Sequence, residues 1–425
     1  MFTRLQALRF KCLRHVDAAL KPFNILVGPN ASGKSTLLDV FAFLRDALLS
    51  DVETAVRRRG FDLRELTWLQ ESPPGFEFAL EATLPQATPG DGYTSAPRSQ
   101  TRLRYELAVG LSEKGEIAVA EEKLWLLPNQ ERSDPSEESV QGRIFDPITS
   151  SIVTDRARTG WRIVIRRTSN SDSTYYHSEK TEWNFTLRSP RRKLGLAGVP
   201  EEEDRFGTAL WLREALSRSV QAIQLDSVRM RQPCPADAPR AFQPDGSNLA
   251  MMVRLLQESD RERFNEWIAH LRTVLPDLRK VEVAERPENR ALYLRVHYEN
   301  EVVVPSWLLS DGTLRFLALT IIAYLPMTNQ LFIVEEPENG IHPRALEAVY
   351  QSLSSVYDSQ VFIATHSPLF LGLADSADLL VLDKTAGGTT IVRGTEHFAL
   401  KDLRLKSKLG DFFAAGILGY HSGIS

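Results

Sequence analysis

The stretch GPNASGKS at residues 28–35 constrains the fold of this chain more than any other feature. It follows a compact apolar run, FNILVG at residues 23–28, and precedes apolar residues that recur every three to four positions as far as Leu48. The first pattern predicts a buried strand and the second an amphipathic helix. A strand, a glycine-rich turn and a helix in this order are typical of loops that bind phosphate.

The residue types in this loop suit phosphate chemistry. Glycines let backbone N–H groups turn inward around phosphate oxygens, and the helix N-terminus adds its dipole. Lys34 can reach the β- and γ-phosphates, and Ser35 offers a hydroxyl to Mg²⁺. We therefore expect ATP with Mg²⁺ at this loop. The alternative, a chance glycine-rich turn, does not explain the strand before it and the helix after it.

A second element, LFIVEEPENGIHP at residues 331–343, places two acids after a short apolar run. We expect its strand to lie beside the strand of the phosphate loop, with its C-terminal end toward the phosphates. Glu335 is then placed to hold Mg²⁺ directly or through water, and Glu336 to polarise the attacking water. The alternative is that both glutamates cap a following helix near Pro343.

Two further elements follow the same logic. In LLSDGTLRFLAL (308–319), Ser310 and Gly312 open an apolar helix and form a second small anion-binding turn. One chain with one phosphate loop needs such a turn only if it docks on a nucleotide held by another subunit. In VFIATHSP (361–368), a strand ends at His366, whose imidazole can hydrogen-bond a γ-phosphate. The alternative for His366 is an ordinary core histidine.

Bulk properties limit the class of protein. The chain has 425 residues, 43% hydrophobic and 25% charged, which is enough for two or three packed units. Its formal net charge is -4, so it has no global basic excess that would indicate nucleic-acid binding. Cys12 and Cys234 are far apart, which argues against a disulfide framework. The N-terminus lacks the apolar core of a signal peptide, and no window approaches the about 18 apolar residues of a membrane span. We expect a cytoplasmic protein that makes no membrane contact.

Changes in periodicity divide the chain. Alternating apolar residues predict an antiparallel sheet with long loops, and strand–helix–strand repetition near the C-terminus predicts a parallel sheet. We therefore expect an α/β fold whose core is split by an insertion. The predicted parts are an N-terminal core segment (1–75), a β-rich lobe (76–205), a helical lobe (206–290), a C-terminal core segment (291–395) and a tail (396–425). The tail could be a docking helix for a partner or an edge helix of the core.

Taken in order, the four motifs resemble the ABC-type ATPases of the SMC/RecF/OLD group. The chain is more closely similar to the stand-alone AAA-family ATPases found beside small effector genes in bacterial defence and mobile islands. Two stretches, 223–256 and 409–419, resemble that subgroup too. The resemblance implies an ABC/SMC-type P-loop ATPase core with a mixed, largely parallel sheet, interrupted by a β-rich and a helical insertion.

The resemblance also implies roles for individual residues. Glu336 is the catalytic base, His366 the switch histidine, and Glu335 with Ser35 the metal ligands. Segment 337–343 is the loop that faces the other subunit. The residues implied to bind nucleotide are Gly28, Pro29, Asn30, Ala31, Ser32, Gly33, Lys34, Ser35 and Thr36, with Ser310 and Gly312 reaching ATP across a dimer.

Three positions depart from the family pattern. Glu335 stands where many relatives have Asp. Its side chain is one methylene longer, which favours a metal contact through water. Asp311 replaces the middle glycine of the commoner signature and adds a charge that we expect Arg315 to offset. No clear Q-loop is present; Gln70 is the candidate, and an ordinary loop glutamine is the alternative.

The insertion contains a basic stretch at residues 151–193, with ten Lys or Arg, four acids and interleaved aromatics. Basic charge beside aromatic rings suits a DNA or RNA backbone. The alternative is a solvated sheet face whose aromatics point into the core, neutralised by the acidic run at 201–204. The prolines and the absence of heptads argue for a folded lobe and against coiled-coil arms.

The resemblance therefore predicts a Mg²⁺-dependent ATPase that acts as a molecular switch. ATP binding is expected to close a homodimer, or a higher even-numbered oligomer, and hydrolysis to reopen it. Residues 396–425 are too few for the nuclease module of OLD proteins, so we expect a separate effector, a nuclease or toxin, in anti-phage defence. The alternatives are a RecF-like repair ATPase that binds DNA directly and an ATP-binding scaffold with little turnover. A transporter subunit is disfavoured.

Overall fold

The computed structural model describes residues 1–84, 101–129, 151–168, 171–385, 387–398, 400 and 410–411. The chain forms two compact units, which are described separately. The first comprises residues 1–21, 28–220 and 381–392, and the second residues 22–27, 221–380 and 393–425. Most of the tail, with its candidate docking or edge helix, and the loops at 85–100 and 130–150 lie outside the described residues, and the domain boundaries given above stay predictions.

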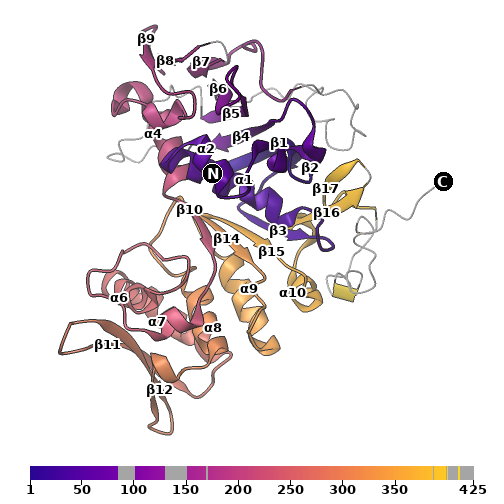
Figure 1. Ribbon diagram of the computed structural model, residues 1–425. Helices are drawn as coiled ribbons and strands as arrows, with labels where there is room; N and C mark the ends of the chain where they lie inside the picture. Colours follow the sequence, from indigo (N-terminus) through magenta and orange to yellow (C-terminus); the bar gives the residue numbers. More distant parts are fainter. Residues whose placement is uncertain are drawn as a thin grey trace. The chain divides into compact units, whose positions relative to one another are not determined.

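The first unit contains an eight-stranded sheet in the order β2-β1-β4-β5-β6-β7-β8-β9 (Figure 1), and every neighbouring pair is antiparallel. This confirms the antiparallel sheet predicted from alternating residues. Because β1 and β2 join it, the sheet begins at the N-terminus. The strands are β1 (Phe2–Phe10), β2 (Leu13–Ala19), β4 (Phe76–Thr83), β5 (Arg102–Leu111), β6 (Ile117–Leu127), β7 (Arg162–Arg167), β8 (Ser173–His177) and β9 (Asn184–Arg188).

Helix α1 of the first unit packs on this sheet through aromatic contacts. Phe43 of α1 meets Phe10, Phe76 and Phe78 of the sheet edge-on, with ring centroids 5.2 to 6.2 Å apart. Such aromatic pairs stabilise a core beyond the apolar area they bury. The elements are α1 (Lys34–Leu49), α2 (Val52–Arg57), α3 (Leu63–Leu66), η1 (Trp68–Gln70), η3 (Leu196–Gly198) and α4 (Glu203–Ser217). Neighbouring strands β16 (Leu379–Thr385) and β17 (Gly388–Arg393) lie mostly in this unit.

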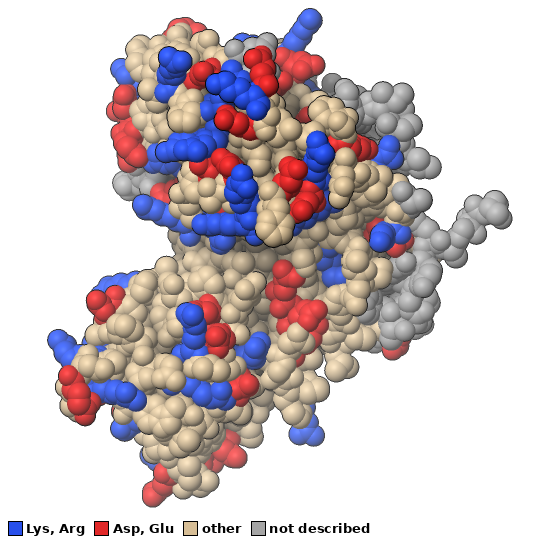
Figure 2. Space-filling view, viewed as in Figure 1, with Lys and Arg blue, Asp and Glu red and all other residues tan. Residues whose placement is uncertain are grey.

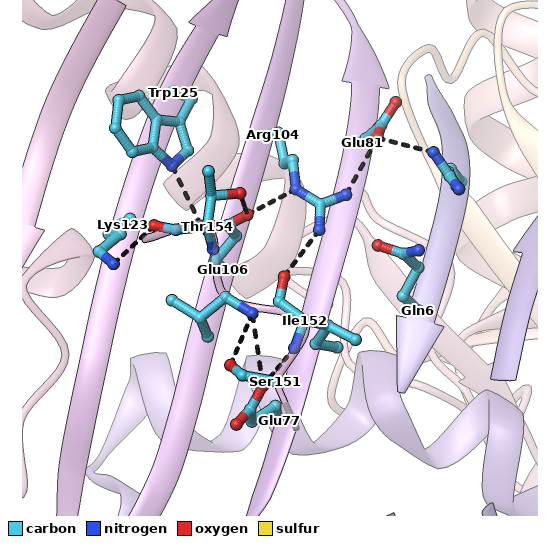
Figure 3. A network of polar contacts seen from close by, with 12 residues as sticks. Gln6, Glu77, Glu81, Arg104, Glu106, Lys123, Trp125, Ser151, Ile152 and Thr154 are labelled. Atoms are coloured by element: carbon cyan, nitrogen blue, oxygen red, sulfur yellow. Dashed lines mark hydrogen bonds and ion pairs between the residues drawn. The ribbon is translucent and has the colours of Figure 1, made fainter. Parts of the chain in front are cut away.

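One part of the sheet carries a buried polar network (Figure 3). Glu106 accepts hydrogen bonds from the Arg104 Nε at 2.6 Å and from the Trp125 Nε1 at 3.1 Å. The main-chain N–H of Ile152 donates to Glu77 and that of Thr154 donates to Glu106. The carboxylates of Glu77 and Glu106 therefore fix residues 151–154 to the sheet. The same hydrogen bonds compensate these buried charges, which are tolerated only when they are paired.

The second unit contains four neighbouring strands in the order β10 (Val220–Ile223), β14 (Leu331–Glu335), β15 (Gln360–Ala364) and β3 (Phe23–Val27). The pairs β14–β15 and β15–β3 are parallel, which confirms the parallel sheet predicted from the strand–helix–strand pattern. The expectation that β14 lies beside the strand of the phosphate loop is wrong. β15 pairs with both strands and lies between them, so the C-terminal ends of β14 and β3 are one strand further apart than expected.

The helices of this unit include one break that periodicity did not reveal. Residues 248–275 carry apolar residues at helical spacing, but the structure divides the stretch at Asp260, whose carboxylate accepts from the Arg263 N–H and starts a new helix. The apolar residues at 301–309 also predict a strand, but only three of these residues form one, β13. The helices are α5 (Ser227–Arg231), α6 (Leu249–Ser259), α7 (Arg261–Arg272), α8 (Asp311–Ile321), α9 (Leu346–Ser354) and α10 (Pro368–Leu373), with single turns η4 (Ser306–Leu308), η5 (Pro343–Ala345) and η6 (Ser376–Asp378).

A three-stranded sheet, β11-β12-β13, completes the second unit, with strands β11 (Leu278–Glu285), β12 (Leu292–Tyr298) and β13 (Val303–Pro305). In Figure 1 the β11–β12 pair lies beside α6 and α7, and both helices contact it. Within the part of the chain that the structure describes, no helix has the length and apolar character to cross a membrane.

Candidate functional site

The phosphate loop connects Val27, at the end of β3, to Lys34, at the start of α1. Gly28 and Gly33 both have positive φ, 157° and 103°. A Cβ at position 28 would lie 2.0 Å from the Leu382 carbonyl oxygen, and one at position 33 would lie 2.7 Å from the Thr389 Oγ1. Both positions therefore require glycine, for space as well as for backbone conformation.

Lys34 is held by its own loop. Its Nζ donates to the carbonyl oxygens of Gly28 at 2.8 Å and Pro29 at 3.0 Å, and the side chain is buried. The ammonium group therefore lies against the loop that precedes the helix. Gly33 caps α1 without any side-chain hydrogen bond, so the positive end of a 16-residue helix adjoins the same loop.

The other loop residues divide into exposed and buried positions. Pro29, Asn30, Ala31 and Ser35 are exposed, and Thr36 is partly buried and accepts from the Cys12 Sγ at 3.4 Å. Ser32 is fully buried; its carbonyl accepts from the Thr389 hydroxyl at 2.9 Å, while its own Oγ has no hydrogen-bond partner. The loop thus presents a buried cation, a helix N-terminus and an exposed hydroxyl, a donor set that fits a nucleotide phosphate and its Mg²⁺.

The end of β14 presents the paired acids. Glu335 is the last residue of the strand and is exposed. Glu336 has a left-handed backbone, φ 49°, and its N–H donates to the Ala364 carbonyl at the end of β15 at 2.7 Å. Asn339 donates to the Glu336 Oε2, and the Glu336 Oε1 lies 3.9 Å from the His366 Nε2. The structure therefore brings Glu336 and His366 together, although the two motifs are well separated in sequence.

Sequence reasoning missed a third acid in this region, Glu338. Its Oε1 accepts from the Thr365 hydroxyl at 2.6 Å and from the His366 N–H at 3.3 Å. Its Oε2 is buried without a hydrogen-bond partner. Glu338 thus connects the loop after β14 to the residues after β15. The available signal is an acid two residues beyond the pair, within the segment 337–343 that is predicted to face the other subunit.

The predicted signature residues lie at the start of α8. Ser310 is its N-cap: the Oγ accepts from the Thr313 N–H at 3.1 Å and shares a hydrogen bond of 2.8 Å with the Thr313 hydroxyl. A Cβ at Gly312 would lie 2.8 Å from the Gly340 carbonyl oxygen. Gly312 therefore permits close approach between α8 and the loop 337–343.

The prediction that Arg315 offsets the charge of Asp311 is wrong. Asp311 forms an ion pair with Arg231, at the end of α5. Arg315 instead directs its Nη2 to the Leu225 carbonyl at 3.2 Å. The reason is geometric: Asp311 and Arg315 share one helix, but a residue from a different helix reaches the carboxylate. Sequence reasoning assigned Arg231 no role.

Gln70, the Q-loop candidate, lies in the first unit, is exposed and has a φ of 54°. Its N–H donates to the Thr67 carbonyl within a single turn. The structure assigns this glutamine no contact that would distinguish a Q-loop from an ordinary loop, so the assignment stays a prediction.

Part of the basic stretch 151–193 belongs to the core of the first unit. Arg167 is fully buried and donates to the carbonyls of Ser189, Pro190 and Lys193. Tyr176 stacks on Phe185, and burial raises its pKa well above the ordinary value. On the face shown in Figure 2, basic and acidic side chains of this unit are interspersed. The alternative interpretation, aromatics in the core behind a mixed surface, therefore holds for Tyr176, whereas Tyr175 and Trp183 are exposed.

Some remaining basic residues are paired. Arg191 binds Asp172, and this hydrogen bond holds the pKa of the Asp172 carboxyl below its usual value. Arg192 lies 3.3 Å from Asp51. No group of three or more His, Cys, Asp or Glu side chains suited to a metal ion is found among the described residues. A metal in a P-loop site commonly takes one or two protein ligands and completes its shell with phosphate and water.

Comparisons with known proteins agree with these observations. A family model described as "AAA domain, putative AbiEii toxin, Type IV TA system" matches residues 23–372. The Old nuclease of Escherichia phage P2 is 32% identical over 104 residues, 22% of this chain and 18% of that protein. The OLD nuclease of Thermus scotoductus is 40% identical over 57 residues, 13% of this chain and 10% of that protein. The matches thus span less than a fifth of these curated relatives.

The fold is similar to that of a solved SMC head. The crystal structure of the SmcHead bound to the C-winged helix domain of ScpA aligns with a TM-score of 0.51 at 12% identity, covering 92% of this chain and 97% of that one. At this identity the likeness shows the fold, an ABC/SMC-type P-loop ATPase core. Since the family model covers most of the sequence, the chain belongs to that AAA family and is an SMC/OLD-like AAA ATPase.

Proposed function

We propose that this protein is a Mg²⁺-dependent molecular switch, in which ATP closes two copies into a dimer and hydrolysis reopens them. The observation that carries the proposal is the position of Glu336. Its carboxylate follows a buried strand, is held by Asn339, and lies 3.9 Å from the imidazole of His366. An acid and an imidazole at one sheet edge suit the orientation of an attacking water and the detection of a γ-phosphate.

The backbone at Glu336 supports this role. A left-handed conformation costs a non-glycine residue roughly 1–2 kcal/mol. The hydrogen bond from the Glu336 N–H to the Ala364 carbonyl fixes it nonetheless. Strained residues of this kind are concentrated at functional sites, where the rest of the fold over-determines them.

Each motif then has a defined task. Lys34 and the N-terminus of α1 bind the phosphates, and Ser35 and Glu335 are the residues that would hold Mg²⁺. A Mg²⁺ ion held by these residues would supply positive charge to offset the charge that develops on the transferred phosphoryl group. Glu336 orients the attacking water and accepts its proton, and His366 donates a hydrogen bond toward the γ-phosphate. Glu335 is one methylene longer than aspartate, which favours contact with Mg²⁺ through a water molecule.

The dimer accounts for Ser310 and Gly312. Both residues lie at the N-terminus of an 11-residue helix, and Ser310 is exposed. A helix N-terminus attracts anions through its N–H groups and its dipole. In our proposal it binds the ATP held by the other copy, so that each nucleotide is enclosed by two subunits and hydrolysis separates them.

The switch would control a separate effector. The matching family is described by a toxin and a toxin–antitoxin system, and the two curated relatives are nucleases. We propose a nuclease or toxin on another chain as the partner, and anti-phage defence as the setting. Co-purification of this protein with the product of a neighbouring gene, in the presence of ATP, tests that part of the proposal.

Two variants test the ATPase mechanism. Glu336→Gln should lower ATP turnover by about 10²- to 10⁴-fold, because a general base contributes that much. It should retain ATP binding and accumulate as a dimer, measured by light scattering with MgATP. Lys34→Ala should lose ATP binding, whereas Lys114→Ala, at an exposed lysine remote from the loop in sequence, should retain it. Unchanged turnover in the first variant, or unchanged ATP binding in the second, would refute the corresponding assignment.

Direct DNA binding is a second candidate, and one feature favours it. Arg166 and Tyr175 are cross-strand neighbours on β7 and β8, and both are exposed. Exposed Arg and Tyr side by side suit the backbone and bases of single-stranded nucleic acid. Arg166→Ala together with Tyr175→Ala should weaken binding of single-stranded DNA at physiological salt, whereas Arg57→Ala should not. Equal affinity in the two variants would remove this candidate.

A further inference from the structure

The start of α8 carries a negative charge where our proposed function needs an anion to bind. Asp311 is the first residue of the helix and follows the N-cap Ser310. Its side chain is 59% exposed. The helix N-terminus attracts phosphate, but a carboxylate at the same place repels it. An unpaired Asp311 would therefore oppose the docking of a nucleotide at Ser310 and Gly312.

Arg231 pairs with this carboxylate. Its Nη2 donates to the Asp311 Oδ1 and also to the Leu309 carbonyl at 3.0 Å, and its Nε donates to the same carbonyl at 3.3 Å. The guanidinium thus binds the residue before Ser310 and the residue after it. Arginine suits this task because its planar group presents several donors in fixed directions.

The position of Arg231 is itself fixed by the fold. Its carbonyl accepts from the Ser306 hydroxyl at 3.2 Å, which joins the end of α5 to the turn η4. The Arg231 side chain is only 27% exposed. Arg315 is engaged elsewhere, at the Leu225 carbonyl. The cation beside the signature is therefore supplied by α5, a helix far from α8 in sequence.

We propose that Arg231 is a positioning residue that neutralises Asp311, so that the start of α8 can accept the triphosphate of an ATP molecule bound to a second copy of the chain. The inference rests on the proposed dimer function. Arg231 acts through Asp311 and the Leu309 carbonyl, and it does not itself contact the nucleotide. Its removal should weaken ATP-dependent dimerisation without changing how a single copy binds ATP.

The test uses the full-length Glu336→Gln protein, in which ATP should persist. The dimer dissociation constant is measured with MgATP by sedimentation velocity, and ATP affinity is measured at protein concentrations below dimerisation. Adding Arg231→Gln should raise the dimer dissociation constant by about tenfold or more, because juxtaposed like charges at an interface are strongly unfavourable. ATP affinity of the single copy should stay the same.

A second substitution separates charge neutralisation from a purely structural role. Asp311→Asn removes the charge that Arg231 offsets, so the double variant Arg231→Gln/Asp311→Asn should recover dimerisation to within about threefold of the parent. Arg231→Lys keeps the charge and should dimerise almost as well as the parent. Thermal unfolding midpoints of all variants provide the stability readout.

Each outcome is decisive. A double variant as weak as Arg231→Gln alone would show that Arg231 does not act through Asp311 and would overturn the inference. The inference would also be overturned if Arg231→Gln dimerised like the parent. It would be overturned too if Arg231→Gln lost dimerisation together with a lowered unfolding midpoint, and adding Asp311→Asn did not restore that midpoint. If the Glu336→Gln parent binds ATP but stays monomeric, the proposed dimer function itself fails, and this inference fails with it.

Discussion

The Oε1 of Glu338 lies 2.6 Å from the hydroxyl oxygen of Thr365, so an acid in the loop after β14 accepts a hydrogen bond from the residue that follows β15. The same oxygen accepts from the His366 N–H. Glu338 thereby holds the backbone that carries His366. In parallel strands the C-terminal ends lie at one edge of the sheet, which explains how two separate motifs come to share one carboxylate.

Loss of the Glu338 carboxylate should affect both stability and turnover. Thr365 is fully buried, and Glu338→Ala deprives its hydroxyl of an acceptor. We expect the free energy of unfolding to fall by about 1–3 kcal/mol. ATP turnover should fall by about 10- to 100-fold, because a small displacement of His366 costs that much. Urea unfolding and a steady-state ATPase assay measure the two effects.

Two controls accompany this substitution. Glu338→Gln keeps an oxygen acceptor and should retain most of the turnover. Glu347→Ala, at an exposed position of α9, should change neither quantity. Full turnover by Glu338→Ala would show that Glu338 does not position His366.

A methyl group at Gly312 should disturb the start of α8. Its Cβ would lie 2.8 Å from the Gly340 carbonyl, closer than real Cβ atoms approach. Gly312→Ala should therefore lower the free energy of unfolding by about 1–3 kcal/mol, the usual cost of overpacking. Gly372→Ala is the matched control: it lies in α10 with no atom within 4 Å of its Cβ position and should be neutral or slightly stabilising. Equal unfolding midpoints for the two variants would contradict the close approach.

The buried network of Figure 3 should contribute strongly to stability. Glu106 is fully buried and accepts hydrogen bonds from Arg104, Trp125 and Thr154. Glu106→Ala leaves the Arg104 charge only partly compensated, so we expect a loss of about 3–5 kcal/mol in urea unfolding. Glu116→Ala, at an exposed position near the start of β6, should change stability by no more than about 0.5 kcal/mol. If Glu106→Ala lowered the free energy of unfolding no more than Glu116→Ala does, the result would argue against a coupled network.

The β11–β12 pair should make stability depend on acid pH. The hydrogen bond with His297, and then the charges of Arg295 and Lys280, hold the pKa of Glu282 below its ordinary value of 4.5. The folded state therefore favours the ionised carboxylate. This contribution is fully present above pH 4.5 and is lost as the pH falls through the lower, folded-state pKa.

Glu282→Gln should flatten that part of the stability curve. Urea midpoints measured between about pH 3 and about pH 6 should fall more steeply with acid in the wild type than in this variant. Glu299→Gln, which replaces an exposed glutamate, should keep the wild-type slope. Parallel slopes for wild type and Glu282→Gln would show that this carboxylate does not cause the acid dependence.

Strand β6 shows where apolar periodicity fails to indicate a strand. β6 contains Glu121, Glu122 and Lys123 in its centre, a charged run that interrupts the apolar alternation expected of a strand. Glu122 is nevertheless fully buried, and burial raises its pKa. Its carboxylate accepts from the Gly195 and Leu196 N–H groups, which come from a distant turn. Only partners supplied by the tertiary structure make such a run compatible with a buried strand.

The site shows the same division. The predicted phosphate loop, paired acids, signature and histidine can each be recognised in the sequence, because each depends on short-range spacing within one turn or strand. The order of β14, β15 and β3, the pairing of Asp311 with Arg231, and the role of Glu338 cannot be. These depend on which segments become neighbours after folding, and hydrophobic patterning contains no such information.

The sequence by itself determined the chemistry available to this protein: a loop that only glycines can form, a lysine at its end, and acids at the end of an apolar strand. These follow from local backbone geometry and the period of apolar residues. The tertiary structure alone decided which charges face one another. Glu336 meets His366, and Arg231 rather than Arg315 meets Asp311, because parallel strands align their ends and a separate helix, α5, reaches the start of α8.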